Sequence, residues 1–210
     1  MENPSDPDLD RAARVMLLSP VRLSGARGRL LLDGTSEASL ARQLRSAEGA
    51  PLGEVFSFVS GLYFRGKASY ASRFAHASGA PAAAFVMCAG AGLCRLEERV
   101  DLERLRGWAR VSIREDNPHF TAPLYRHASE LLAQHDESAR FVLLGSVATN
   151  KYVTPLLDVF GERLWFPREF LGRGDMSRGS LLLRAVKDGR ELEYRTVQSL
   201  VSAEISVREP

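Results

Sequence analysis

The stretch RFVLLGSVATNKYVTPLLDVFG, residues 140–161, contains a complete strand–loop–helix unit. It begins with an almost continuous apolar run of strand length, which is typical of a strand buried on both faces of a parallel sheet. Pro155 lies near the start of the segment that follows, and Gly161 closes it, as expected of a helix. The unit therefore predicts a protein of the α/β class.

The same alternation of apolar runs and helical patterns extends along most of the chain. Strands are expected at residues 14–20, 53–63, 82–90, 110–116, 140–146, 163–167 and 190–197. Helices are expected at residues 36–48, 64–77, 100–109, 121–135, 150–161 and 177–186. The last of these helical segments could instead form a strand. Residues 21–35 are expected to be a loop rich in glycine and arginine that leads into another apolar run.

These elements predict a single Rossmann-like three-layer α/β domain. Its sheet is expected to be mostly parallel, covered on both faces, with an antiparallel C-terminal edge strand. The domain is expected to span residues 11–210. Residues 1–10 contain two prolines and four acidic residues and predict a disordered N-terminal tail.

Composition narrows the class of protein. The 210 residues are 45% hydrophobic and 26% charged, as in ordinary soluble domains. The 28 basic and 26 acidic residues leave a net charge of +2, so any nucleic-acid contact has to be local. Two cysteines are too few for a disulfide framework, and no signal peptide or membrane-length apolar run is present. We therefore expect a cytoplasmic protein that does not associate with membranes.

The loops that follow the expected parallel strands are the first candidates for a site, because ligands of open α/β sheets bind at the carboxyl ends of strands. Gly145 and Ser146 follow the strand at 140–146, where a small residue lets a ligand approach the backbone. Lys151 and Tyr152 occupy the first turn of the next helix. An equally simple interpretation of these two side chains is a solvated helix end.

The sequence GRGDMSRG, residues 172–179, provides a second candidate loop. Gly172 and Gly174 permit a tight or left-handed backbone. Arg173 and Arg178 offer forked donors for a phosphate or carboxylate, and Asp175 could act as a catalytic carboxylate. The alternative is a capped helix that carries surface arginines.

A third candidate is Asp116, which lies beside His119 in the loop REDNPHF and could act as an acid or base. Ordinary loop polarity also explains this pair. The four histidines show no metal-binding spacing, so neither a metal ion nor another cofactor is expected.

Five stretches occur in an order that resembles a group of largely uncharacterised bacterial α/β proteins: VMLLSP…SGARG, SGLYFRGKASYA, FVMCAGAGLCRLEE, GSVATNKYVTPLLDVFG and FPREFLGRGDMSRG. The α/β domain of archaeosine synthase is similar in its first half. The resemblance spans roughly residues 14–186. The chain has Ser19-Pro20 where better-known relatives have Cys-Ser or Cys-Gly, and GDMSRG where they have GIGRQ.

This resemblance implies a site for a nucleobase, nucleoside or nucleotide. The positions that it points to are Ser19, Gly25, Tyr63, Arg65, Gly145, Tyr152, Gly172 and Gly174. Three functions remain open from the sequence. The first is an enzyme of nucleosides or nucleotides, such as an N-glycosidic hydrolase or transferase. The second is a non-catalytic module for nucleotides or nucleic acid, and the third is an interaction or scaffold protein.

The enzyme hypothesis assigns roles to particular side chains. Asp175 or Asp116 would be the carboxylate that stabilises an oxocarbenium-like transition state. Tyr63 or Tyr152 would stack on the ligand or form a hydrogen bond with it. The anion would be held by arginines, of which the candidates are Arg65, Arg173 and Arg178.

Overall fold

The computed structural model describes residues 12–76 and 83–200 of the chain, so the tail predicted at residues 1–10 lies outside the described residues. In the described part, six strands form one sheet in the order β4-β3-β1-β6-β7-β8. The central strands β1, β3, β6 and β7 run parallel, whereas β4 and β8 pair antiparallel with β3 and β7. The strand bounds are β1 (Arg14–Leu18), β3 (Ala84–Cys88), β4 (Gly92–Arg95), β6 (Arg140–Leu144), β7 (Leu164–Pro167) and β8 (Tyr194–Thr196). The mostly parallel sheet and its antiparallel C-terminal edge are therefore confirmed.

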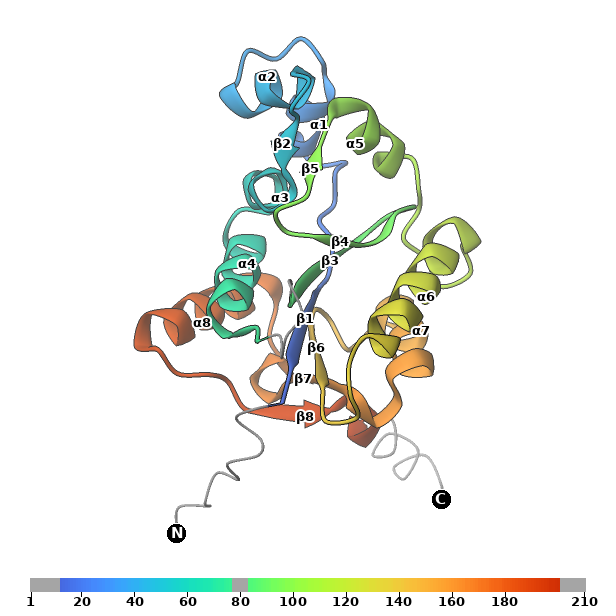
Figure 1. The fold of residues 1–210 in the computed structure, drawn as a ribbon. Coiled ribbons are helices and arrows are strands. Elements are labelled where there is room, and N and C mark those ends of the chain that lie inside the picture. The colour runs from blue at the N-terminus through green and yellow to red at the C-terminus, as the bar shows by residue number, and fades with distance from the viewer. Residues whose placement is uncertain (1–11, 77–82, 201–210) are drawn as a thin grey trace.

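Alternate residues of β1 belong to two separate cores, as the period of a strand requires. Val15 and Leu17 pack with residues of α6 and α7, and Met16 and Leu18 pack with residues of α4 and α8. Helices thus cover both faces of the sheet (Figure 1). The bounds of these helices are α4 (Leu62–Phe74), α6 (Pro118–Ala133), α7 (Asn150–Phe160) and α8 (Asp175–Asp188).

A smaller group of elements stands beyond the carboxyl end of β1, at the top of Figure 1. We call it the lobe and define it as residues 26–60 together with residues 99–109. Strand β2 pairs antiparallel with β5 and joins the two parts. The elements of the lobe are α1 (Ala26–Leu32), α2 (Ser39–Arg45), β2 (Ala50–Pro51), α3 (Leu52–Ser60), β5 (Arg99–Val100) and α5 (Leu102–Ala109).

Several predicted elements have to be corrected. The strand predicted at residues 53–63 is mostly helix α3, because Leu52, Val55 and Phe56 follow helical spacing and are buried together. Residues 110–116, also predicted as a strand, form turns in which the Arg114 amide donates to the Ser112 carbonyl. The loop predicted at residues 21–35 contains α1, whereas residues 177–186 are helical and belong to α8.

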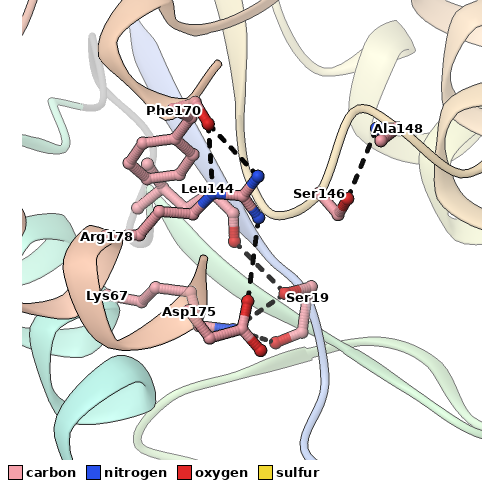
Figure 2. Close-up of polar contacts among 8 residues, drawn as sticks. All are labelled: Ser19, Lys67, Leu144, Ser146, Ala148, Phe170, Asp175 and Arg178. Carbon is pink, nitrogen blue, oxygen red and sulfur yellow. Dashed lines mark hydrogen bonds and ion pairs between the residues drawn. The ribbon is translucent and has the colours of Figure 1, made fainter. Parts of the chain in front are cut away.

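Helices α4 and α8 approach each other through glycines. A Cβ atom on Gly66 would lie 2.8 Å from the carbonyl oxygen of Gly179. A Cβ atom on Gly179 would lie 2.9 Å from Cα of Tyr63. The helices therefore meet backbone to backbone, which brings the start of α8 close to Lys67 on α4 (Figure 2). Among the described residues, no helix has both the length and the apolar character needed to cross a membrane.

Candidate functional site

A cavity of about 690 Å³ lies where the carboxyl ends of three parallel strands face the lobe. Ser19, Ala89 and Ser146, which follow β1, β3 and β6, line one side of it. Val59 and Trp108 of the lobe line the other side. The volume is in the range of about 300–1,000 Å³ that is usual for ligand pockets, and the position is the one that open α/β sheets favour.

The floor of the cavity contains a buried lysine in contact with a serine (Figure 2). Lys67 is only 1% exposed. Its Nζ donates hydrogen bonds to the carbonyl oxygen of Ser19 at 2.6 Å and to Ser19 Oγ at 2.8 Å. Ser19 Oγ is also 3.4 Å from the carbonyl oxygen of Leu144, to which it can donate. The amine and the hydroxyl are therefore held in hydrogen-bonding contact.

Burial lowers the pKa of Lys67 to about 7, and the negative charge of Asp175 offsets part of this effect. No carboxylate in the described part of the chain forms a salt bridge with Nζ. The aromatic rings of Tyr63 and Phe64 lie beneath it, with centroids 4.6 and 5.0 Å away. Because the environment supplies little compensating charge, a large fraction of this amine is neutral near pH 7.

Sequence reasoning missed Lys67, although the sequence contains a signal for it. Phe64 and Ala71 form the apolar stripe of the helix that was predicted at residues 64–77. Lys67 is three residues after one and four before the other, so it occupies the same face. A lysine within an apolar stripe is rarely buried without a reason, because burial of its charge costs free energy.

The loop before α8 is held by Arg178. This side chain is 8% exposed, and its Nε and NH2 atoms each lie 3.2 Å from the carbonyl oxygen of Phe170, to which they donate. Its NH1 atom is 3.7 Å from Oδ1 of Asp175. Asp175 itself is 72% exposed and lines the cavity. Arg178 therefore fixes the loop, and Asp175 presents its carboxylate to the cavity (Figure 2).

Two tyrosines belong to the same cavity. Burial raises the pKa of Tyr63 to about 12, although the neighbouring Arg178 opposes the rise. Burial also raises the pKa of Tyr152 to about 12, with smaller contributions from Tyr63 and Asp175. Both phenols therefore remain protonated donors at neutral pH. The Tyr63 hydroxyl and Thr149 Oγ1 are buried and form no hydrogen bond of standard geometry within the described residues.

The charge of the lining favours an anion. Two cationic side chains besides the buried Lys67 line the cavity, those of Arg22 and Lys151. Asp175 is the only carboxylate among the lining residues in the part of the chain that the structure describes. Cationic side chains therefore outnumber carboxylates around the cavity, and a phosphate or carboxylate group of a ligand would be attracted to it.

The structure brings together only some of the residues that the sequence singled out. Those that line the cavity are Ser19, Tyr63, Ser146, Lys151, Tyr152 and Asp175. Those that do not line it are Gly25, Arg65, Asp116, Gly145, Gly172, Arg173, Gly174 and Arg178. The segments that follow β1, β3 and β6 and the start of α8 nevertheless converge, because each contributes at least one lining residue: Ser19, Ala89, Ser146 and Asp175.

The residues outside the cavity have other surroundings. Asp116 forms a salt bridge of 2.7 Å with Arg114, and both side chains are 67% exposed. Arg65 lies in a separate surface depression. Arg173 donates to Ser177 Oγ at 3.1 Å. None of these three polar candidates lines the cavity, so none is positioned to contact a ligand there.

The four glycines among the candidates lie in loops or at helix N-caps. Gly145 is buried behind Ser19, where an added Cβ atom would lie 3.0 Å from the Ser19 Cβ atom. Gly172 has a φ of 68° in the turn before α8, Gly174 is the N-cap of that helix, and Gly25 is the N-cap of α1. These four positions shape the loops that carry the lining residues.

Cys88 and Cys94 are both buried and free. Burial raises the pKa of the Cys88 thiol well above its usual value, so it is not an activated nucleophile. Within residues 12–76 and 83–200, no group of three or more His, Cys, Asp or Glu side chains is arranged to hold a metal ion. Comparisons of the chain with protein-family models, with curated proteins and with solved structures find no match.

Proposed function

We propose that the protein is an enzyme that acts on a nucleoside or nucleotide, with cleavage or exchange of an N-glycosidic bond as its reaction. The observation that carries this proposal is the combination of side chains around one cavity. Aromatic rings, cationic groups and a lone carboxylate from Asp175 line it together within the described residues. This is the set that a base, a phosphate and an electron-poor sugar each require.

The aromatic part supports recognition of a nucleobase. Tyr63, Tyr152 and Trp108 line the cavity, and stacking of a base on an aromatic ring contributes about 1–3 kcal/mol. The two tyrosines also keep their protons, so each can donate a hydrogen bond to a base or a sugar hydroxyl.

The polar part supports binding of phosphate and stabilisation of charge. Arg22 and Lys151 can hold an anionic group at the wall of the cavity. Asp175 would lie beside the sugar and stabilise positive charge as the bond to the base breaks. Asp116, the other carboxylate considered above, takes no part because its side chain pairs with Arg114 away from the cavity.

The experiment is a thermal-shift screen against nucleobases, nucleosides, nucleotides and short oligonucleotides, followed by chromatographic detection of released base. A ligand that binds the folded state raises the melting temperature by mass action. We expect a shift with a nucleoside or nucleotide, and turnover that Asp175→Asn abolishes while the thermal shift remains. Asp116→Asn is the matched control and should keep its turnover.

Other outcomes would overturn the proposal in different ways. A shift with oligonucleotides alone, lost as salt is raised, would favour a nucleic-acid-binding module. A shift with nucleotides and no release of base would favour a non-catalytic nucleotide-binding module. No shift with any of these compounds at millimolar concentration would leave an interaction or scaffold protein as the best description.

A further inference from the structure

The contact between Lys67 and Ser19 has a chemistry that N-glycosidic cleavage does not use. We infer that Ser19 Oγ is a nucleophile, that Lys67 is its general base, and that this pair carries out acyl transfer on an ester or amide with an anionic group. The inference goes beyond the proposed function, because it concerns a different bond and a different reacting residue. Its basis is the geometry of the cavity floor.

The hydrogen bonds around Nζ place the amine against the serine. Lys67 Nζ is 2.6 Å from the carbonyl oxygen of Ser19 and 2.8 Å from its Oγ. A neutral amine has two N–H donors and one lone pair. If one N–H donates to the carbonyl oxygen, the lone pair can accept the proton of Oγ–H, so the amine is placed as a base for this hydroxyl.

The surroundings of Lys67 allow its amine to be neutral near neutral pH. Lys67 is buried against the rings of Tyr63 and Phe64, and within the described residues no carboxylate pairs with it. Burial lowers the pKa of Lys67 to about 7, which is a suitable value for a base near neutral pH. A lysine amine with its ordinary pKa would be protonated near pH 7 and could not accept a proton from serine.

Ser19 is the more accessible member of the pair. Both residues line the cavity, but Ser19, which directly follows β1, is 6% exposed, whereas Lys67 on α4 is 1% exposed. Gly145 leaves room for the serine side chain, because an added Cβ atom there would lie 3.0 Å from the Ser19 Cβ atom. The serine is therefore the member of the pair that meets a substrate, and the lysine acts through it.

Acyl transfer makes the carbonyl oxygen of the substrate negative, and this oxygen needs hydrogen-bond donors. The segment 21–24 follows Ser19 and lines the same cavity. Its backbone amides donate no hydrogen bond to any residue that the structure describes. In the inferred reaction these amides are assigned as donors to the carbonyl oxygen of the substrate, and Arg22 and Lys151 as the groups that attract its anionic part.

Each bond that forms in the proposed reaction is matched by a bond that breaks, and each proton has an acceptor. Oγ of Ser19 forms a bond to the carbonyl carbon, and its proton passes to Nζ of Lys67. Collapse of the tetrahedral intermediate breaks the C–O or C–N bond, and the leaving group takes the proton from Nζ. Water then hydrolyses the ester on Ser19 and restores the free hydroxyl.

The test is covalent labelling with phenylmethanesulfonyl fluoride, in which Oγ bonds to sulfur, fluoride leaves and the proton passes through Lys67 to solvent. Intact-mass spectrometry and peptide mapping give the extent and the site of labelling. We expect one adduct, on Ser19, and a labelling rate that rises with pH and levels off above about pH 7, as the amine loses its proton. Hydrolysis of p-nitrophenyl acetate should show the same pH dependence.

Variants separate catalysis from a structural role. Ser19→Ala should abolish labelling, and Lys67→Met should slow it by about 100-fold or more, the usual loss when a general base is removed. The matched controls are Ser180→Ala and Lys187→Met, which alter exposed residues of α8 and should label like the wild type. Circular dichroism establishes whether each variant is folded.

The site and the pH dependence of labelling are measured on the wild-type protein, so they test the inference even if Lys67→Met does not fold. Absence of an adduct on Ser19, adducts spread over several serines, or a rate independent of pH would each overturn it. The nucleotide screen on the same preparation is independent. Ligand binding with an unreactive Ser19 would retain the proposed function alone, and a labelled Ser19 with no nucleotide binding would retain this inference alone.

Discussion

Replacement of Lys67 by methionine should change how stability depends on pH. The ordinary pKa of lysine is 10.5, and burial lowers the pKa of Lys67 to about 7. One pKa unit corresponds to about 1.4 kcal/mol, so burial of the protonated amine costs the folded state about 5 kcal/mol. Below about pH 7 this full cost is present, because both the folded and the unfolded chains carry the proton.

The sign of the effect follows from the bound protons. Between about pH 7 and pH 10.5 the unfolded chain keeps the proton on Lys67 while the folded chain has lost it. Stability therefore rises with pH in this window. Methionine does not titrate, so the unfolding free energy of the wild type should increase relative to that of Lys67→Met by several kcal/mol. Loss of the two hydrogen bonds to Ser19 shifts the whole curve without changing its slope.

Urea unfolding followed by tryptophan fluorescence, at a series of pH values from about 6 to about 10, measures this difference. Tyrosines and cysteines that titrate in the same range occur in both proteins and cancel in the subtraction. Lys187→Met replaces an exposed lysine and serves as the control, whose curve should stay parallel to that of the wild type. A constant difference between wild type and Lys67→Met would refute the reasoning, because it would mean that the buried amine titrates like a solvated one.

Three further substitutions test the fold by the same unfolding measurement. Gly66→Ala should lower stability by about 1–3 kcal/mol, because its methyl group would lie against the backbone of Gly179 and cannot turn away. Gly107→Ala, in α5 with no atom within 4 Å of the new methyl group, should raise stability by about 0.5–1 kcal/mol; equal effects at the two glycines would contradict the tight helix crossing. Asp101→Ala should cost about 1 kcal/mol, because Asp101 Oδ1 accepts from the Arg104 amide 2.8 Å away at the start of α5, and an unchanged midpoint would exclude this capping role.

Much of the sheet could be predicted because its central strands leave few alternatives. The segments around β1, β3 and β6 are short apolar runs, each followed by residues that stop a strand, such as Pro20 and Gly145. Such runs need cover on both faces, which requires helices between them. The parallel direction of these strands, and therefore a cavity at their carboxyl ends, follow from this pattern.

The lobe was harder to predict because its elements are short and their stability depends on tertiary contacts. In α3, Phe56 and Phe58 are separated by a serine, and this alternation imitates a strand. The helical spacing of Val55 and Phe56 becomes decisive only once both side chains are buried. Residues 110–116 likewise alternate, but they provide no strand because no neighbouring strand pairs with them among the described residues.

Sequence reasoning named several residues of the cavity lining but missed Lys67. Ser19, Tyr152 and Asp175 were among the residues expected at a site, and all three line one cavity. Lys67 was missed because it lies on a helix, and reasoning from loops at strand ends does not consider helix faces. Arg178 was expected to hold an anion, yet its guanidinium donates two hydrogen bonds to the Phe170 carbonyl oxygen. No sequence pattern reveals this contact.

The two sides of the cavity come from different parts of the architecture, and this has a consequence for how the protein can diverge. Lys67 and Ser19 depend on the sheet and on the glycine crossing of α4 and α8, where small changes disturb the core. Val59 and Trp108 belong to the lobe, whose parts are joined by the two-residue strands β2 and β5. Substitutions or insertions in the lobe can therefore reshape what the cavity admits while its reactive floor stays intact. Descendants of this chain could exchange one ligand for another without rebuilding the fold.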